Sequence, residues 1–517
     1  MVFMEAEVLS EGLQKDRPVA ATKIRAVYGF LLALVLLAGF GIRLYGLKNP
    51  PLDFFAPRQL RSLLIARAVY YKLSPAADPT LRQKAIDLAN LEVYEPPILE
   101  QLVGLGYVVI GSEQFWLARV FQAVFWSIGG LALFAMGRRM TSFFPALAGL
   151  SFYLFLPFGI VASRSFQPDP WMVMWILVTG YALFRWSETP NWKWAILTGL
   201  LGGIAALVKI YAVFFVAPMI AAVWLAATGF RRTLRNPQTY VMTVLVAVPS
   251  VIYYLILNQA RSSDFLSFWT LSLASLILTS KFYVEWMAMI GGIMGLTVIL
   301  AGILGVLLAP KNARALLIGA WIGYVLFGLT SPYQYITHDY YHLTLIGLVG
   351  LSIVPFLAAV FQVLAKQAWI WRAMAIGVLV FTAGYSLWVG RSKIYVATYT
   401  NEPASWRKVA AALPTGKTFV SLTSDYDMRL RYYGWTMSAF TWPSSADLKL
   451  FSIHGNKPID YETYFKENTS GKDYFLVTAL SEFDAQPQLK DILTERYPVF
   501  VQGNGFTIYD LDHPITK

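Results

Sequence analysis

Long apolar segments, each followed by a short polar connection, run through the first 390 residues of the chain. A helix needs about 20 apolar residues to cross the hydrocarbon core of a membrane, and most of these segments approach that length. The pattern therefore predicts an all-α polytopic membrane domain with about 11 transmembrane helices. The predicted spans are 24–47, 115–136, 143–161, 170–186, 194–209, 211–229, 239–257, 284–308, 315–330, 341–362 and 372–390.

One further apolar segment, Ile98–Gly111, has only about 14 residues, which is short for a regular span. If it crossed the membrane, every later connection would change sides. We therefore expect an interfacial or re-entrant helix on the outer side, within a long outer loop at 48–114.

The pattern changes after residue 390, where short apolar runs alternate with polar turns. "KTFVSLTS" and "DYFLVTAL" predict two strands, and "GNGFTIYDL" predicts a final hairpin. "ASWRKVAAALP" predicts a helix that ends before Pro414. The chain thus divides into an N-terminal segment at 1–23, a membrane domain at 24–390 that includes the outer loop, and a small soluble α/β domain at 391–517.

Basic residues indicate the orientation of the predicted spans. Five connections that fall on one side of the membrane, if the chain alternates, carry eleven basic residues and the single acid Glu188. Positively charged loops stay in the cytoplasm, so the N-terminus is expected there and the C-terminal domain outside, as in a multi-pass protein of the cell inner membrane. The basic residues are Arg138, Arg139, Arg185, Lys193, Arg231, Arg232, Arg235, Lys311, Arg314, Lys366 and Arg372.

Composition excludes several classes of protein. The chain is 57% hydrophobic and 14% charged, whereas a soluble domain has about 25% charged residues. It has no cysteine and four histidines, which excludes disulfides, thiolate chemistry and a His-rich metal centre. The net charge of +12 arises before Arg391, among the apolar segments, so membrane topology explains it better than nucleic-acid binding. Gly-rich phosphate loops and HExxH motifs are absent from the sequence.

The first outer loop holds the strongest candidate chemistry. Asp53 lies close to the expected membrane surface, and Arg58 and Arg61 follow three residues apart on one face of a predicted helix. The carboxylate could take a proton from an acceptor while the arginines hold a lipid phosphate. The alternative is a membrane-surface helix whose arginines reach head groups and whose cap is Asp53.

Other polar residues gather at the outer ends of the predicted spans. Each also has a structural explanation, as a helix cap or a satisfied interfacial side chain. Acids buried in the middle of spans, which are typical of proton-coupled transporters, are scarce. The outer candidates are Glu95 before two prolines, Arg164, Gln167 and Asp169 in "SRSFQPDP", Lys209, and His338, Tyr341 and His342 in "HDYYHL".

Several motifs together resemble the GT-C membrane glycosyltransferases, in particular the glycosyltransferase family 39 group, which includes protein O-mannosyltransferases and the lipid A aminoarabinose transferase. The resemblance covers about 20–390 and rests on the order and spacing of its pieces. These are an Asp after the first span, "RQ" and "IAR", an acid before Pro-Pro, "SRSFQPDPWMVMWILVTGYALFRW", "GLLGGIAALVKIYAVFFVAP" and "HDYYHLTLIGLVGLS".

The resemblance implies transfer of a sugar from a polyprenyl-phosphate donor to an acceptor outside the cytoplasm, which could be a lipid, a protein or a cell-wall glycan. Asp53 would be the general base of an inverting displacement. Arg58 and the other outer candidates would bind the donor phosphate or sugar. Phe54 follows Asp53 where many relatives have a second acid. A divalent metal therefore has little support, because one carboxylate is a poor site for a hard cation.

Two alternatives come from other classes of protein. A flippase for a lipid-linked substrate would move its substrate without releasing sugar, and its functional acids would lie inside spans. A non-catalytic membrane assembly factor would tolerate replacement of Asp53.

Overall fold

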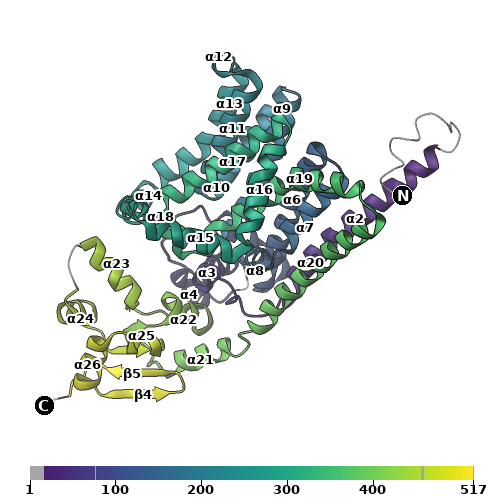
Figure 1. Cartoon of the computed structure of the whole chain (residues 1–517). Helices are drawn as coiled ribbons and strands as arrows, with labels where there is room; N and C mark the ends of the chain where they lie inside the picture. The colour runs from purple at the N-terminus through teal and green to yellow at the C-terminus, as the bar shows by residue number, and fades with distance from the viewer. Residues whose placement is uncertain (1–16, 76, 456–458, 516–517) are drawn as a thin grey trace. The chain divides into compact units, whose positions relative to one another are not determined.

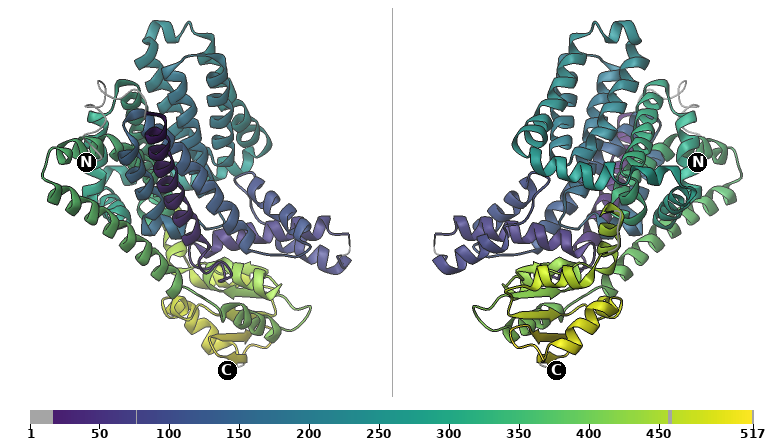
Figure 2. Two further views of the ribbon diagram at one scale, coloured as in Figure 1. Left: turned by 90° about the vertical axis from the view of Figure 1, so that its right-hand side faces the viewer. Right: turned by 90° about the vertical axis from the view of Figure 1, so that its left-hand side faces the viewer.

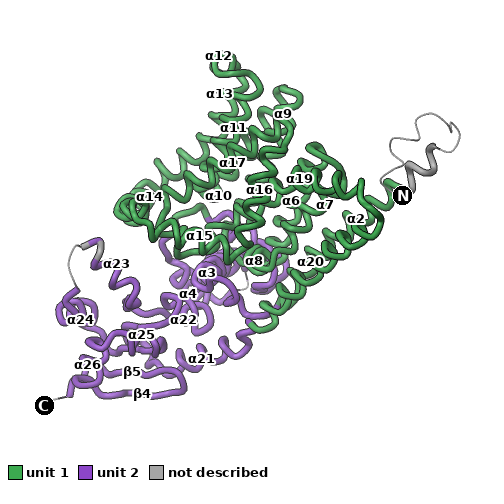
Figure 3. Tube along the Cα trace, in the orientation of Figure 1, with its two compact units in different colours: residues 1–47, 94–96, 118–396 green, residues 48–93, 97–117, 397–517 purple. Residues whose placement is uncertain are grey.

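The computed structural model describes residues 17–75, 77–455 and 459–515, so most of the predicted N-terminal segment at 1–23 lies outside the described residues. The chain forms two compact units (Figure 3). Unit 1 contains residues 1–47, 94–96 and 118–396, and unit 2 contains residues 48–93, 97–117 and 397–517. The sequence placed the outer loop 48–114 with the membrane domain, but most of this loop shares a compact unit with the C-terminal region.

Unit 1 is a bundle of long apolar helices, several of which run side by side in Figures 1 and 2. Its helices are α2 (Arg17–Leu44), α6 (Trp116–Met140), α7 (Phe143–Phe155), α8 (Pro157–Ala162), α9 (Pro168–Glu188), α10 (Trp192–Val208), η1 (Ile210–Ala212), α11 (Val213–Thr228), α12 (Phe230–Thr233), α13 (Pro237–Ser250), η2 (Val251–Leu257), α14 (Gln259–Leu266), η3 (Ser267–Leu271), η4 (Ala274–Leu278), α15 (Ser280–Met294), α16 (Leu296–Leu308), α17 (Lys311–Thr330), α18 (Pro332–Thr337), η5 (Asp339–His342), α19 (Leu343–Ala365) and α20 (Trp369–Val396).

The prediction of an all-α polytopic membrane domain followed by a small α/β domain is confirmed. By length and composition, seven helices of the described chain can cross a membrane, or eight if one bent pair is a single span. The other predicted spans coincide with shorter or more polar helices. The prediction of one continuous helix over 284–308 is wrong, because α15 and α16 meet at Gly295, whose φ of 84° interrupts the helix.

Small residues bring the helices of unit 1 close together. A Cβ on Gly319 would lie 2.5 Å from the carbonyl oxygen of Pro218, and one on Gly323 would overlap that of Phe214. These glycines are four apart and therefore share the face of α17 that packs on α11. Close backbone approach at small residues is the usual way in which membrane helices associate.

Polar contacts join three of the five basic connections at one end of unit 1. Glu188 forms ion pairs with Arg139 at 2.8 Å and with Arg185 at 3.0 Å. Asn312 donates to the carbonyl oxygen of Ser187 at 3.2 Å. These connections therefore lie together, as the alternating topology requires of them.

Unit 2 combines three helices of the first outer loop with the C-terminal domain. The loop helices are α3 (Ala56–Leu73), α4 (Pro79–Leu88) and α5 (Ile98–Ile110). The C-terminal elements are α21 (Glu402–Ala412), β1 (Phe419–Leu422), η6 (Ser424–Asp427), α22 (Met428–Gly434), β2 (Phe440–Thr441), α23 (Ser445–Gly455), α24 (Tyr461–Thr469), β3 (Tyr474–Val477), α25 (Leu480–Asp484), α26 (Pro487–Arg496), β4 (Val499–Gly503) and β5 (Phe506–Asp510).

The five strands form a single sheet in the order β2-β1-β3-β5-β4. β1 pairs in parallel with β2 and β3, while β5 is antiparallel to β3 and β4. The predicted helix, both predicted strands and the final hairpin are present. Gly505 supplies the positive φ of 81° in the hairpin turn. No pattern in the sequence predicted β2, which has only two residues.

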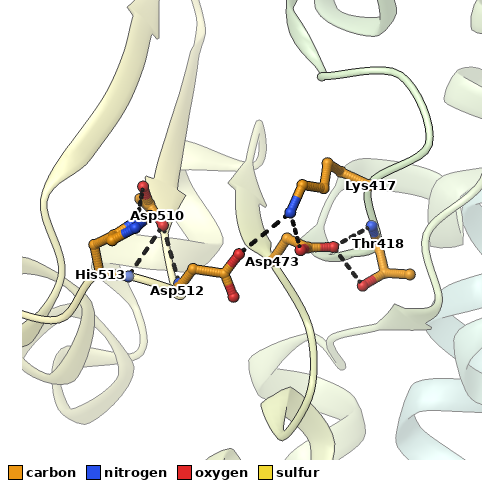
Figure 4. A network of polar contacts seen from close by, with 6 residues as sticks. All are labelled: Lys417, Thr418, Asp473, Asp510, Asp512 and His513. Carbon is orange, nitrogen blue, oxygen red and sulfur yellow. Dashed lines mark hydrogen bonds and ion pairs between the residues drawn. The ribbon is translucent and has the colours of Figure 1, made fainter.

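An ion-pair network joins the starts of β1 and β3 to the end of β5 (Figure 4). Lys417 Nζ lies 2.7 Å from Asp473 Oδ1 and 3.4 Å from Asp512 Oδ2. The other oxygen of Asp473 accepts from the backbone N–H of Thr418 at 2.6 Å and from its hydroxyl at 2.9 Å. The network thus fixes the register of neighbouring strands.

Candidate functional site

Asp53 lies in the turn that leads into α3. Phe55, the N-cap of α3, has φ of 43°, a left-handed conformation that is costly for a bulky residue. Gln59, which is fully buried, donates from Nε2 to the carbonyl oxygen of Phe54 at 2.6 Å and lies 3.4 Å from Asp53 Oδ1. A buried amide on the first turns of α3 therefore holds the turn and orients the half-buried carboxylate.

The arginines predicted beside Asp53 take different positions on α3. Arg58 is half-buried, in the first turn of the helix. Arg61 donates to the backbone carbonyl of Glu92. Ser62 donates to Glu100 Oε1 at 2.7 Å, which joins α3 to α5. Asp53, Arg58 and Arg61 thus all belong to unit 2, and contacts to the rest of the loop hold the helix that carries the two arginines.

A second polar group lies in unit 1. Lys209, between α10 and η1, donates from Nζ to Asp169 Oδ1 at 2.7 Å, and Glu95 Oε1 lies 4.0 Å away. Three aromatic rings surround the ammonium, with centroids 5.2–5.6 Å from Nζ. These rings belong to Tyr211, Tyr340 and Tyr341. The structure thus gathers four predicted residues, Glu95, Asp169, Lys209 and Tyr341, into one buried cluster.

Arg164 is fully buried and donates to backbone carbonyls at the end of α2. Its Nη2 lies 3.0 Å from the oxygen of Gly46, and Nη1 donates to Tyr45. Arg119 on α6 donates to the carbonyls of Gly46 and Leu47 at 3.2 and 3.1 Å. Two guanidinium groups therefore hold the turn that follows α2, near a helix end where a cation is favoured by the helix dipole.

Gln167 is also fully buried, at the N-cap of α9. Its backbone carbonyl accepts from Gln122 Nε2 at 2.5 Å, and the same amide donates to the carbonyl of Ser165 at 3.0 Å. Gln122 on α6 therefore stabilises the turn that carries Arg164, Gln167 and Asp169.

The two predicted histidines differ in their surroundings. His342 is fully buried, with Nδ1 2.7 Å from the hydroxyl of Tyr324 and Nε2 2.8 Å from the carbonyl oxygen of Tyr335. Because a carbonyl can only accept, Nε2 carries the proton and Nδ1 accepts from the tyrosine. The fold accounts for both nitrogens of His342 without a ligand. His338 is half-buried, and its Nδ1 lies 2.7 Å from the hydroxyl of Thr337.

Sequence reasoning missed Gln59 and Gln122, which hold the turns that carry candidate residues, and Arg119, which shares the carbonyl of Gly46 with Arg164. A signal was present for Arg119 and Gln122, because they are polar side chains near the start of an otherwise apolar span. No group of three His, Asp or Glu side chains within residues 17–75, 77–455 and 459–515 could hold a metal ion.

Known proteins provide an independent comparison. A family model described as dolichyl-phosphate-mannose-protein mannosyltransferase matches residues 94–257. No curated protein sequence matches the chain significantly. The crystal structure of ArnT from Cupriavidus metallidurans bound to undecaprenyl phosphate aligns over 95% of this chain and 98% of its own, with 14% identity and a TM-score of 0.54.

Two further structures of the same class align with the chain. The apo oligosaccharyltransferase of Archaeoglobus fulgidus covers 90% of this chain and 71% of its own, with 11% identity and a TM-score of 0.57. The mycobacterial arabinofuranosyltransferase AftD aligns over 94% of this chain and 40% of its own, with 14% identity and a TM-score of 0.50. The chain has the GT-C fold. The GT-C resemblance expected from the sequence is thereby confirmed, and the family-model match covers the GT-C segment that contains Glu95, Arg164, Gln167, Asp169 and Lys209.

Proposed function

We propose that this GT-C protein is a membrane glycosyltransferase that moves a sugar from a polyprenyl-phosphate donor to a hydroxyl group of an acceptor outside the cytoplasm. The GT-C fold and the mannosyltransferase family match support this class of reaction. The ArnT relative binds undecaprenyl phosphate, which supports a lipid-linked donor. The acceptor class stays open between a lipid, a protein and a cell-wall glycan.

The observation that carries the proposal is the oriented carboxylate of Asp53 at the start of α3. Asp53 removes the proton from the acceptor hydroxyl as its oxygen attacks the anomeric carbon of the donor. The bond between that carbon and the phosphate oxygen breaks, and the polyprenyl phosphate leaves. Attack from the face opposite the leaving phosphate inverts the anomeric configuration.

Cationic and polar side chains would bind the donor, because its leaving phosphate carries the charge that develops in the reaction. Arg58 is the phosphate ligand that we favour, since it lies in the first turn of α3, directly after the turn that holds Asp53. Arg61, Arg164, Lys209, Tyr341, His338 and His342 remain candidates for the phosphate, and Glu95, Gln167 and Asp169 for the sugar. To act in this way, Lys209 would have to bind the phosphate beside Asp169 or in its place.

The orientation of the chain is part of the proposal. The basic connections around Glu188 would face the cytoplasm, and the C-terminal domain would lie on the opposite, extracytoplasmic side of the inner membrane. Asp53 would then act on the outer side, where a lipid-linked sugar and an extracytoplasmic acceptor can meet.

The test is transfer of label from radiolabelled polyprenyl-phosphate hexoses to membranes of the source cells, with purified wild-type protein and the Asp53→Asn variant. We expect a labelled product with the wild type and none with the folded variant. Movement of the donor across vesicle membranes without sugar release would favour a flippase instead.

A further inference from the structure

Arg67 joins the first outer loop to the C-terminal domain within unit 2. It lies on α3 and is 4% exposed, and its Nε and Nη2 lie 2.9 and 3.0 Å from the two carboxylate oxygens of Glu113. Its Nη1 donates to the carbonyl oxygen of Tyr432 at 2.8 Å. A buried guanidinium with a two-point carboxylate contact has a fixed position and direction.

Aromatic rings of the C-terminal domain complete this contact. The Arg67 guanidinium carbon lies 4.1 Å from the ring centroid of Tyr432 and 4.3 Å from that of Trp435. The Tyr432 hydroxyl donates to Glu113 Oε1 at 2.7 Å, so loop and domain share one network. Arg67, Glu113, Tyr432 and Trp435 are called the Arg67 clamp below.

The domain side of the clamp is itself held firmly. The residues on either side of α22, Asp427 and Trp435, both have positive φ, of 70° and 53°. Asp427 is fully buried and accepts from the backbone N–H and hydroxyl of Ser438 at 2.8 and 3.0 Å. Arg429 pairs with Glu402 of α21 at 3.0 Å. α22 is therefore a fixed support for Arg67.

The loop side of the clamp leads to Asp53 along a single helix. Gln59 and Arg67 are eight residues apart on α3, a rise of about 12 Å that corresponds to just over two turns. Gln59 orients the Asp53 turn, and Ser62 fixes the middle of the helix to Glu100. A rotation or shift of α3 at Arg67 would therefore move the carboxylate at the other end.

We propose that Arg67 is a positioning residue, through which the C-terminal domain sets the placement of α3 and of the Asp53 carboxylate. The proposal rests on the general-base role given to Asp53 under the proposed function. It assigns the C-terminal domain a part in catalysis that does not require it to touch the substrate. A misplacement of about 1 Å at a catalytic group can cost about 100-fold in rate.

The test compares two identical substitutions in the full-length protein. Glu113→Gln removes the negative charge and one acceptor oxygen that face Arg67, and Glu462→Gln does the same to Arg496 in an exposed two-point pair of the same unit. Three quantities are measured for each variant: hydrogen exchange of the segment 52–60, and kcat and donor KM per folded molecule with a radiolabelled polyprenyl-phosphate hexose.

We expect Glu113→Gln to raise exchange in 52–60 by about tenfold and to lower kcat by about 10–100-fold, with donor KM within twofold of the wild type. Glu462→Gln should change none of the three quantities. Unchanged exchange in Glu113→Gln overturns the proposal, and so does raised exchange with an unchanged kcat.

A milder variant covers the case in which Glu113→Gln does not fold. Tyr432→Phe keeps the ring against Arg67 and removes only the hydrogen bond to Glu113, so it should give smaller changes of the same sign. Wild-type protein without transferase activity would refute the proposed function. Hydrogen exchange would then decide alone whether the clamp positions the Asp53 turn.

Discussion

Lys209 Nζ lies 2.7 Å from Asp169 Oδ1, and each of the two side chains is 2% exposed. Asp169 therefore compensates the charge of Lys209 within the protein, and Glu95 adds a second carboxylate at 4.0 Å. A phosphate at this ammonium would have to compete with both carboxylates. The pair is consequently better explained as a structural ion pair, a brace that joins α9 to the end of α10, than as a preformed anion site.

Asp169→Asn should destabilise the protein by up to about 3–5 kcal/mol, because it removes the nearer carboxylate of a buried ammonium and leaves it Glu95 at 4.0 Å. Thermal unfolding of the purified protein measures this loss. Glu285→Gln is the control, since the Lys281–Glu285 pair is exposed at 3.6 Å and contributes less than about 1 kcal/mol. A lower donor KM in Asp169→Asn would contradict the brace and would indicate that Lys209 binds the phosphate.

Asp53→Asn should lower transfer by a factor of about 10²–10⁴ with little change in stability, because it removes the proton acceptor and keeps the shape of the side chain. Turnover with saturating donor, together with a thermal unfolding curve, measures both effects.

The control for this prediction is Asp87→Asn. Like Asp53, Asp87 has a glutamine side chain beside its carboxylate: Gln83 donates to it at 2.8 Å. Unlike Asp53, it is exposed, on α4. Its replacement should leave turnover unchanged. Near-normal turnover in Asp53→Asn would remove the general-base role from this residue.

The close contact between α11 and α17 predicts that a single added methyl group on α17 will destabilise the protein. Gly323→Ala should lower the melting temperature, because the new methyl group would overlap the carbonyl oxygen of Phe214 and force the helices apart. Overpacking of this kind costs about 1–3 kcal/mol. Gly292→Ala is the matched control, since a Cβ there meets nothing within 4 Å and alanine is favoured by about 1 kcal/mol in a helix. Equal melting temperatures for the two variants would refute the packing argument.

Local sequence pattern accounted for much of the fold. Apolar runs located the helices of unit 1, and strand and turn signals located four strands of the sheet. The break at Gly295 was missed because both flanking segments are apolar, so hydropathy is continuous across it. The glycine pair Gly319 and Gly323 did carry a signal, since small residues four apart mark a close helix contact.

The candidate site was less predictable, because its contacts join distant parts of the chain. Lys209 and Asp169 were each singled out, but their pairing spans 40 residues and no periodicity predicts it. Arg67 contacts Tyr432 across 365 residues, so the association of the first outer loop with the C-terminal domain had no local signal. Tertiary packing alone determines these two relationships.

Acid should weaken the C-terminal domain through Asp473. The Lys417 ammonium, and then the N–H and hydroxyl of Thr418, hold the pKa of Asp473 well below its usual value of 3.8 (Figure 4). Because the pKa is depressed in the folded state, the stabilisation is complete above pH 3.8 and is lost as the pH falls toward the folded pKa. The melting temperature of the domain should therefore fall as the pH drops below about 4.

Asp473→Asn tests this origin of the acid sensitivity. The variant should melt at a lower temperature than the wild type at pH 6, because the ion pair with Lys417 is gone at every pH. Between pH 5 and pH 3 its melting temperature should change less than that of the wild type, since no carboxylate remains at this position to be protonated. Asp491→Asn, at an exposed position on α26, should keep the wild-type slope. If Asp473→Asn and the wild type lose stability equally in acid, another carboxylate controls the transition, and the network of Lys417 and Asp473 does not hold the strands together.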